Sequence, residues 1–262
     1  MDRTRLGNNV EMGSKLVIAN WKMNPASVKE AIALARASDE KGVVVCPPFP
    51  FLSAVAEVVK YAAVGAQDVF WEDKGAYTGE VSPPELAGLG LKYVIVGHSE
   101  RRQSLGETDA MVAKKIVAAV RSHLVPILCV GETKDEHERG KTKEVVVRQL
   151  EIGTSLLLGA PPPVPIIVAY EPIWAISTNP GATPDTPQNA VAMARLIRTT
   201  LRTIAKRGIP LEATIVYGGS VTAKNAAAFM NAKEIGGVLV GGASLKKDEF
   251  MKIISAASQT GR

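Results

Sequence analysis

The 262-residue sequence has few cysteines, few aromatic residues and no block of like charges, and each shortage excludes a class of protein. The two cysteines, Cys46 and Cys129, lie inside apolar runs, and their number and spacing fit neither a disulfide framework nor a zinc site. Aromatic residues make up only 5% of the chain, so the mixed basic and aromatic surface of a nucleic-acid-binding protein is missing. We therefore expect buried, reduced thiols, no metal site and no nucleic-acid partner.

Long apolar segments are also missing. The longest apolar runs span about eight residues, whereas a transmembrane helix needs about 20. Residues 1–14 are polar and lack the apolar core of a secretory signal, so we interpret them as a short tail that need not be ordered. We expect a cytoplasmic protein with no membrane partner. Its net charge of +5 is mild and would favour a small anionic ligand.

Short apolar runs alternate with longer amphipathic segments from residue 15 onward. The runs are continuous, as is typical of strands buried on both faces of a sheet. The predicted strands are residues 16–20, 42–46, 63–67, 93–97, 125–130, 165–170, 214–218 and 237–241. Segments with helical periodicity lie between them, at residues 27–38, 82–91, 109–122, 144–158, 188–206, 223–230 and 248–258.

Eight strands in alternation with helical segments predict an α/β fold with an all-parallel sheet, which closes as a (β/α)₈ barrel. Residues 15–262 are interpreted as one domain, because no linker interrupts the pattern. A doubly wound open sheet would normally carry a glycine fingerprint after its first strand. Here the first strand runs into Asn-Trp-Lys-Met-Asn, residues 20–24, which disfavours that alternative.

Functional groups of such barrels lie at the carboxyl ends of the strands. At these positions the sequence has an amide, an ammonium, an imidazole, a carboxylate and two glycine-rich turns: Asn20, Lys22, His98, Glu171, Gly218–Ser220 and Gly241–Gly242. Each has an ordinary structural explanation, such as a surface lysine, a core histidine, a capping carboxylate or a turn. Their joint placement on one rim favours a site, whereas His123 and His137 are assigned to solvated surface.

The chemistry of this rim suggests a small phosphorylated substrate. Glycine-rich turns after the seventh and eighth strands let backbone N–H groups approach a phosphate. His98 opens the sequence His-Ser-Glu-Arg-Arg, and a helix beginning there would favour a neutral imidazole that donates a hydrogen bond. Glu171 can then act as a general base, and Lys22 as a fixed positive charge near developing negative charge.

Five motifs carry a more specific signal. The sequences ANWKMN, VGHSERR, AYEPIWAI, YGGSV and LVGGASL occur in this order, each at the end of a predicted strand. Together they resemble the triosephosphate isomerase family over residues 15–255, which implies a TIM barrel. The resemblance implies reversible conversion of dihydroxyacetone phosphate and D-glyceraldehyde 3-phosphate through an enediolate, in glycolysis and gluconeogenesis, without a cofactor.

The same resemblance implies a role for each matching residue. Glu171 would be the base and His98 the electrophile, while Asn20 and Lys22 would bind and polarise the substrate and Glu100 would support Lys22. The backbone of Ser177, Ser220, Gly241 and Gly242 would hold the phosphate. A mobile lid would comprise Pro172, Ile173, Trp174, Ala175, Ile176, Ser177, Thr178 and Asn179.

The lid sequence departs from the family pattern. Ser177 replaces a glycine, Pro180 fixes its own φ, and Gly181 offers freedom in compensation. We expect the lid to close with altered kinetics.

Residues 65–83 resemble the family loop that docks into a neighbouring subunit, with Thr78 at its tip, so we expect a homodimer. Two alternatives stay open at this stage: a Schiff-base aldolase, which needs a lysine at an inner strand end, and a binding protein that has lost turnover.

Overall fold

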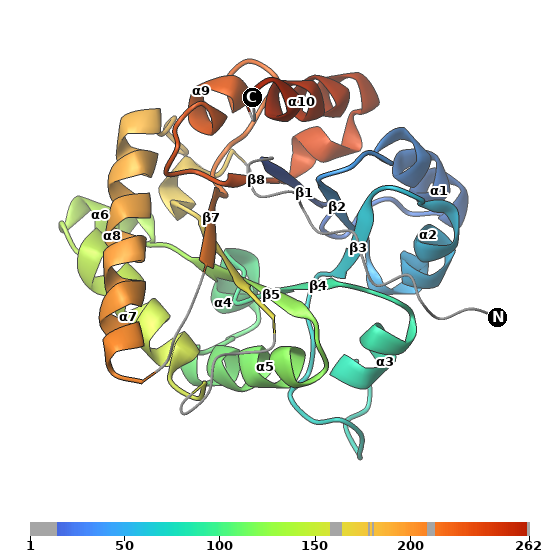
Figure 1. Cartoon of the computed structure of the whole chain (residues 1–262), viewed down its shortest axis with the longest axis horizontal. Coiled ribbons are helices and arrows are strands. Elements are labelled where there is room, and N and C mark those ends of the chain that lie inside the picture. Colours follow the sequence, from blue (N-terminus) through green and yellow to red (C-terminus); the bar gives the residue numbers. More distant parts are fainter. Residues whose placement is uncertain (1–14, 158–163, 178, 180, 209–212, 261–262) are drawn as a thin grey trace.

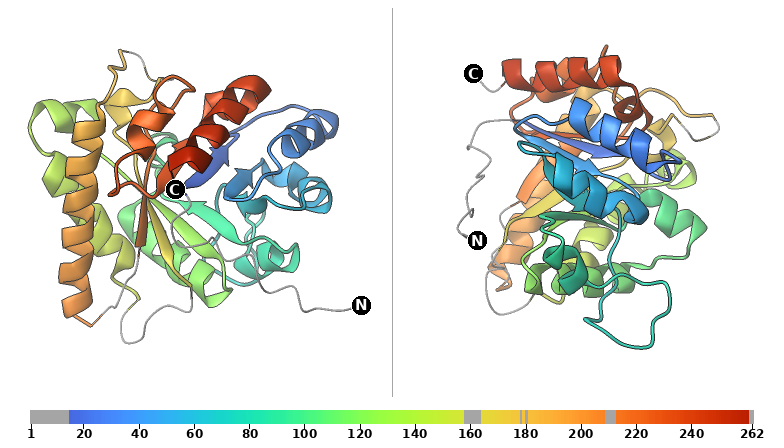
Figure 2. Two further views of the ribbon diagram at one scale, coloured as in Figure 1. Left: turned by 45° about the horizontal axis from the view of Figure 1, so that its top comes forward. Right: turned by 90° about the vertical axis from the view of Figure 1, so that its right-hand side faces the viewer.

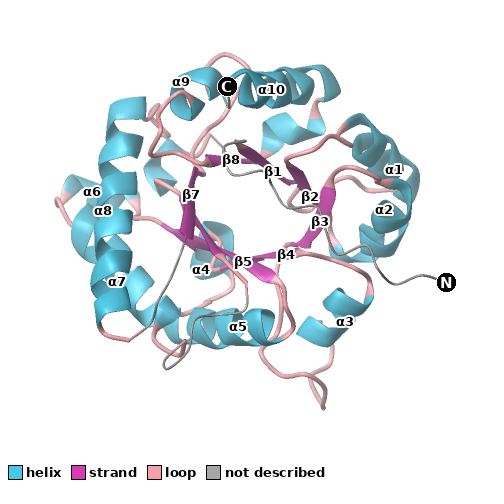
Figure 3. Ribbon diagram, viewed as in Figure 1, coloured by secondary structure: helices cyan, strands magenta, loops and turns pink. Residues whose placement is uncertain are grey.

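The eight predicted strands form a closed parallel barrel, β1 to β8 in sequence order, in a computed structural model. The structure describes residues 15–157, 164–177, 179, 181–208 and 213–260. The predicted tail, residues 1–14, and the lid residues Thr178 and Pro180 lie outside them. Figure 1 and Figure 3 show the barrel as a central ring of strands with the helices outside it.

Each strand lies within about a residue of its predicted place. The strands are β1 Leu16–Asn20, β2 Val43–Cys46, β3 Ala63–Ala66, β4 Tyr93–Val96, β5 Val125–Val130, β6 Ile166–Tyr170, β7 Ala213–Tyr217 and β8 Gly237–Val240. The pairing of β1 with β8, which joins Val17 to Val238, closes the barrel. The predicted (β/α)₈ fold is therefore confirmed.

The helices occupy the connections between strands. They are α1 Val28–Ala37, α2 Leu52–Val58, α3 Pro83–Gly88, α4 Ser99–Ser104, α5 Asp109–Arg121, α6 Lys134–Glu138, α7 Thr142–Thr154, α8 Pro187–Lys206, α9 Ala226–Met230 and α10 Lys247–Thr260. Short 3₁₀ turns are η1 Phe49–Phe51, η2 Ile173–Ala175 and η3 Gly242–Leu245. Several helices begin at a capping side chain; for example, the hydroxyl oxygen of Thr108 accepts from Met111 N–H at the start of α5.

Two hydrophobic layers explain why the strands read as continuous apolar runs. Alternate side chains such as Ile18, Ile127 and Leu239 fill the inside of the barrel. Their neighbours along the strands, such as Val17 and Leu128, pack outward against the helices. Because the strands are largely buried on both faces, polar groups are found mainly near the strand ends, where the predicted site residues lie.

One connection departs from the compact pattern. The segment between β3 and α3 projects from the barrel as a long loop (Figure 2), and residues 72–80 within it are all exposed. Within the described ranges, no helix is both long enough and apolar enough to cross a lipid bilayer.

Candidate active site

The predicted site residues meet at one end of the barrel. Asn20 ends β1, Glu171 follows β6, and His98 precedes α4 by one residue. They line a cavity of about 270 Å³ together with Lys22, Ile176, Ser177, Gly218, Ser220, Gly241 and Gly242. Asn20, His98 and Glu171 are buried, at 5%, 7% and 2% exposure, so their polar groups face the cavity rather than bulk water.

The carboxylate of Glu171 is held by two groups from the start of α4. Its Oε1 lies 3.1 Å from Nε2 of His98, and its Oε2 accepts a hydrogen bond of 3.0 Å from the Ser99 backbone N–H. The backbone N–H of Glu100 donates to Nδ1 of His98 at 3.2 Å. Because Nδ1 accepts, a neutral ring carries its proton on Nε2, which points at Glu171 and into the cavity.

Two glycines make room for Glu171. A Cβ atom added to Gly218 would lie 2.9 Å from Cγ of Glu171, and one added to Gly131 would collide with the carbonyl oxygen of Glu171. Neither glycine needs a positive φ, because neither adopts one. The requirement for glycine at these two positions is therefore steric, and it fixes where the Glu171 side chain can lie.

Lys22 is positioned by an unusual backbone conformation and by two neighbours, Asn20 and Glu100. Its φ of 54° is in the left-handed region, which a lysine seldom adopts. Its N–H donates to Oδ1 of Asn20 at 3.0 Å, and its Nζ lies 2.5 Å from Oε1 of Glu100. The ammonium therefore stands at the cavity wall with its charge partly offset by Glu100.

Gln67 is a site residue that the sequence analysis did not single out. Its Nε2 donates to the carbonyl oxygens of Lys22 and Cys46, each at 2.8 Å, and so ties β3 to the strained backbone at Lys22. The signal was present, because Gln67 directly follows β3. The rule of reading the residue after each strand would have found it.

The tip of the predicted lid lies over the glycine-rich turns. The backbone N–H of Ser177 donates to Oγ of Ser220 at 2.9 Å. Gly181 has a φ of 69°, whereas Ser177 does not adopt a positive φ. The serine is therefore unstrained where the family pattern has glycine, and the left-handed residue stands at Gly181 instead.

The base of the lid is fixed to Glu132, a second residue missed at the sequence level. Pro172 leads into η2, where Ile173 and Ala175 are buried. The Ile173 N–H donates to the Glu132 carbonyl at 3.1 Å, and the indole N–H of Trp174 donates to Oε1 of Glu132 at 2.7 Å. The apolar lid side chains are thus packed against the protein.

The second half of the lid is held by Asn179. Its side-chain amide donates to the Ile173 carbonyl at 2.8 Å, and its N–H donates to the Ile176 carbonyl at 2.9 Å. The segment therefore folds back on its own first turn.

His137 and His123 are both exposed, as the sequence analysis expected. The structure adds one contact of His137, because its ring, with the side chain 43% exposed, stacks on Trp174 with centroids 4.3 Å apart. This contact is not evident from the sequence, since Trp174 lies 37 residues further along the chain.

Among the described residues, no group of three or more His, Cys, Asp or Glu side chains is arranged to hold a metal ion.

Comparisons with known proteins agree with this geometry. The sequence model of the triosephosphate isomerase family matches residues 15–257. The chain is 42% identical over 253 residues to the triosephosphate isomerase of Dictyoglomus thermophilum, covering 94% of this chain and 100% of that protein. It is 45% identical over 251 residues to that of Moorella thermoacetica, covering 93% and 99%. It is also 43% identical over 261 residues to that of Acidithiobacillus ferrooxidans, covering 96% and 99%. With these matches along almost its whole length, the chain belongs to the triosephosphate isomerase family.

Proposed function

We propose that this chain interconverts dihydroxyacetone phosphate and D-glyceraldehyde 3-phosphate, with Glu171 as the base and His98 as the electrophile. The observation that carries this proposal is the pair itself. A buried carboxylate and an imidazole N–H lie 3.1 Å apart, both facing a cavity bordered by glycine-rich turns. Family membership supports the same reaction.

Glu171 would take the proton from the carbon next to the substrate carbonyl. The C–H electrons form the new C=C bond, and the carbonyl oxygen takes on negative charge as the enediolate. The Nε2–H of His98 is placed to stabilise that oxygen by a hydrogen bond. A proton also passes from the hydroxyl oxygen on the first carbon to the former carbonyl oxygen, and the protonated Glu171 returns its proton to the former carbonyl carbon, so that the first carbon now carries the carbonyl group. The base is thereby regenerated and no other reactant is consumed.

Lys22 and Asn20 would provide the electrostatic part of catalysis. The ammonium of Lys22 stands at the wall of the cavity, where positive charge favours both the phosphate dianion and the enediolate. Glu100 supports it through the contact with Nζ. Asn20 braces the Lys22 backbone, so both residues serve orientation as well as charge.

The phosphate would be held by backbone groups of Ser177, Ser220, Gly241 and Gly242. An added Cβ would meet nothing within 4 Å at Gly242, which leaves open space for an anion to approach the backbone there. Closure of residues 172–179 over the site would exclude water. That matters because a phosphorylated enediolate in water loses phosphate as a side reaction.

A Schiff-base aldolase and a binding protein without turnover are not favoured. An aldolase needs its lysine at the reacting carbon, whereas Glu171 directly follows β6, and Lys22 pairs with Glu100. A binding protein would not need a carboxylate and an imidazole held at hydrogen-bond distance.

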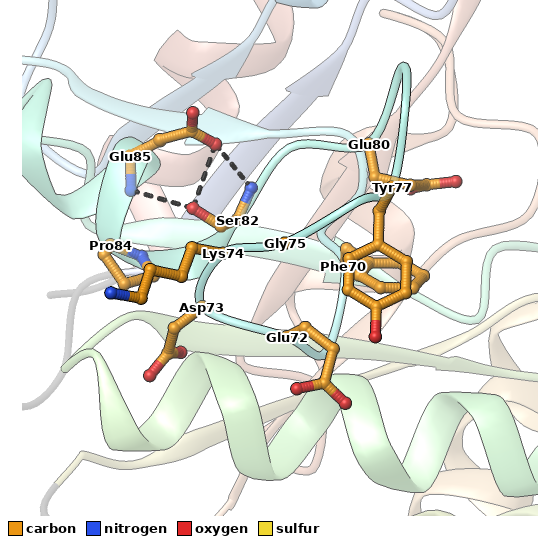
Figure 4. Close-up of a pocket in the computed structure, with 10 residues that line it drawn as sticks. All are labelled: Phe70, Glu72, Asp73, Lys74, Gly75, Tyr77, Glu80, Ser82, Pro84 and Glu85. Carbon is orange, nitrogen blue, oxygen red and sulfur yellow. Dashed lines mark hydrogen bonds between the residues drawn. The ribbon is translucent and has the colours of Figure 1, made fainter.

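A homodimer is a further part of the proposal, with Thr78 at the contact. The supporting feature is the loop between β3 and α3, shown in Figure 4, whose tip is exposed while its base is ordered by the hydrogen bonds between Ser82 and Glu85. The ring of Tyr77 packs against Phe70 with centroids 4.7 Å apart, which stiffens the loop. Met23, at 93% exposure, offers an apolar surface for a second copy to cover.

We also propose a cytoplasmic location and a place in glycolysis and gluconeogenesis. Both cysteines are free and buried, and burial raises the pKa of the Cys46 thiol, so neither is prepared for disulfide chemistry. A reducing compartment fits this arrangement.

Deuterium incorporation tests the reaction. During turnover in D₂O, a base that exchanges its proton with solvent should place deuterium on the carbon next to the product carbonyl. A coupled assay with a reductase that acts on dihydroxyacetone phosphate would follow the rate. Turnover without any deuterium in the product would contradict a carboxylate-mediated transfer and favour direct hydride migration.

A further inference from the structure

The carboxylate of Glu132, at the base of the lid, is completely buried and surrounded by donors from several parts of the chain. Oε1 accepts from the indole N–H of Trp174 at 2.7 Å, the hydroxyl of Tyr170 at 3.2 Å and the hydroxyl of Thr142 at 3.2 Å. Nδ1 of His137 lies 3.4 Å from the same oxygen. Glu132 thus joins β6, the lid and the helix pair α6–α7.

Charge distinguishes His137 from the other three partners. Trp, Tyr and Thr are neutral donors, whereas a buried carboxylate is costly to ionise without an opposite charge nearby. Among the described residues, His137 is the one basic side chain within 4.0 Å of Glu132. The field of Glu132 also contributes, after burial, to the raised pKa of Asp185, so a second acid shares this region.

The other charged groups around His137 are engaged elsewhere or exposed. Glu136 caps α6 through Thr133, and Asp135 pairs with Arg139 at 3.0 Å. The Nζ of Lys134 is directed at Gly181. The remaining charged residues of α6 and the start of α7, all exposed, are Glu138, Lys141, Lys143 and Glu144.

His137 also touches the lid directly. Its ring and that of Trp174 are stacked at 4.3 Å with an interplanar angle of 24°. The residue is held in place by α6, whose N-terminus has a full capping box between Thr133 and Glu136. One fixed side chain therefore contacts both the ring of Trp174 and the carboxylate that accepts its N–H.

We propose that His137 is a positioning residue for the lid, acting through Trp174 and Glu132. It stacks on Trp174 and lies beside the carboxylate of Glu132, and this holds the lid base in the conformation in which Ser177 reaches Ser220. Without this side chain both contacts are lost and the lid base is held less firmly.

This inference builds on the proposed lid role of residues 172–179, and kinetics of matched variants test it. His137→Gln removes the ring and the charge, whereas His137→Arg keeps a planar, permanently charged group that can stack on an indole. At pH 6 we expect kcat/KM of His137→Gln to be about 3- to 10-fold below wild type, the scale of a lost aromatic contact with a charge. His137→Arg should hold wild-type activity from pH 6 to pH 8.

Rescue by arginine separates positioning from a merely structural role. His137→Arg keeps both a planar group against Trp174 and a donor beside Glu132, whereas His137→Gln loses the stacking contact. A His137→Arg enzyme no better than His137→Gln would overturn the proposal.

An NMR measurement on the full chain tests the contact between His137 and Trp174 without an activity assay. With ¹⁵N-labelled tryptophan, the indole signal that disappears in Trp174→Phe identifies Trp174 among the three tryptophans of the chain. That signal should differ in chemical shift between the wild type and His137→Gln, because the stacked ring is removed. His123→Asn is the matched control at the other surface histidine and should leave the signal unchanged. An identical Trp174 signal in the wild type and His137→Gln would refute the coupling even if catalysis by Glu171 is correct.

Discussion

Nε2 of His98 and Oε1 of Glu171 lie 3.1 Å apart across the barrel, one from the end of β4 and the other from the end of β6. The contact is direct only while no substrate separates the two groups. A substrate carbonyl that entered between them would meet a donor on one side and a base on the other. In the proposed mechanism the pair would act as a preformed arrangement whose two halves come from different strands, so displacing either half should slow the reaction.

Replacing the base isolates its contribution. Glu171→Gln keeps the size of the side chain and an oxygen that can accept from Ser99 N–H, but it cannot take a proton. We expect kcat to fall by about 10²- to 10⁴-fold, the usual scale for losing a general base. Steady-state assays measure this, and a circular dichroism spectrum checks that the fold is intact. A variant with near-normal turnover would remove Glu171 from the mechanism.

Displacing the base without changing it is a separate test. In Gly218→Ala the new Cβ would lie 2.9 Å from Cγ of Glu171 and push the carboxylate away from His98. Misplacement of a reacting group by about 1 Å can lower the rate by about 10²-fold, so we expect kcat to fall by about 10- to 100-fold.

Gly88→Ala is the matched control, because an added Cβ there meets nothing within 4 Å and Gly88 ends α3, away from the cavity. It should leave kcat unchanged. Equal losses in both alanine variants would show that the effect is general rather than steric at Glu171.

The barrel could be predicted from the sequence because both layers of its core produce local patterns of apolar residues. A strand such as Ile166–Tyr170 is apolar at every position, and a helix such as Asp109–Arg121 has apolar residues at helical spacing. The sequence pattern named no helix in residues 47–62, where the structure has η1 and α2. Proline at positions 47, 48 and 50 obscures the periodicity there.

Contacts between distant residues produce no such pattern. Lys114 and Lys115 are adjacent in one helix, yet Lys114 is exposed and Lys115 is 2% exposed. Only the tertiary structure shows that Lys115 faces two buried acids. The same holds for Glu132, whose partners Tyr170 and Trp174 lie 38 and 42 residues further along the chain. Looking at the carboxyl ends of the predicted strands identifies the side chains that face the cavity. It does not identify the residues that hold those side chains in position.

The buried ion cluster predicts a large loss of stability when its cation is removed. Nζ of Lys115 lies 2.7 Å from Oδ1 of Asp68 and 2.7 Å from Oε1 of Glu107. Lys115→Met leaves both acids buried without this ammonium, although Arg101 still contacts Asp68 at 2.8 Å. We expect the free energy of unfolding to fall by about 3–5 kcal/mol, as when one partner of a buried pair is removed.

Urea denaturation measures this loss, with Lys114→Met as the control. Lys114 is exposed and its Nζ lies 5.1 Å from the centre of the Trp71 ring. That single cation–π contact should contribute about 0.5–1 kcal/mol. Comparable losses in the two variants would show that the cluster contributes no more than a surface contact.

Asp185, which follows the lid, predicts a defined pH dependence of stability. Burial is the main cause that raises the pKa of Asp185, and the field of Glu132 adds to it, while hydrogen bonds from Thr186 and Asn189 oppose the rise. A raised pKa means that the folded state holds this proton at a pH where the unfolded chain has released it. The carboxyl group therefore lowers stability as the pH rises above the unfolded value of about 3.9. Asp185→Asn cannot ionise and keeps an oxygen that can accept from Thr186 N–H, which donates at 2.7 Å.

The free energies of unfolding of Asp185→Asn and the wild type should consequently differ least near pH 3.5, where Asp185 is protonated in both states. As the pH rises, the free energy of unfolding of the variant should increase relative to that of the wild type. Once the carboxyl group has also ionised in the folded protein, this difference becomes constant. Urea unfolding at intervals from about pH 3.5 to about pH 7 gives this difference curve, and all other titrating groups cancel from it. A difference that moves in favour of the wild type over the same range would mean that the hydrogen bonds from Thr186 and Asn189 outweigh burial, and that the pKa of Asp185 is lowered in the folded protein.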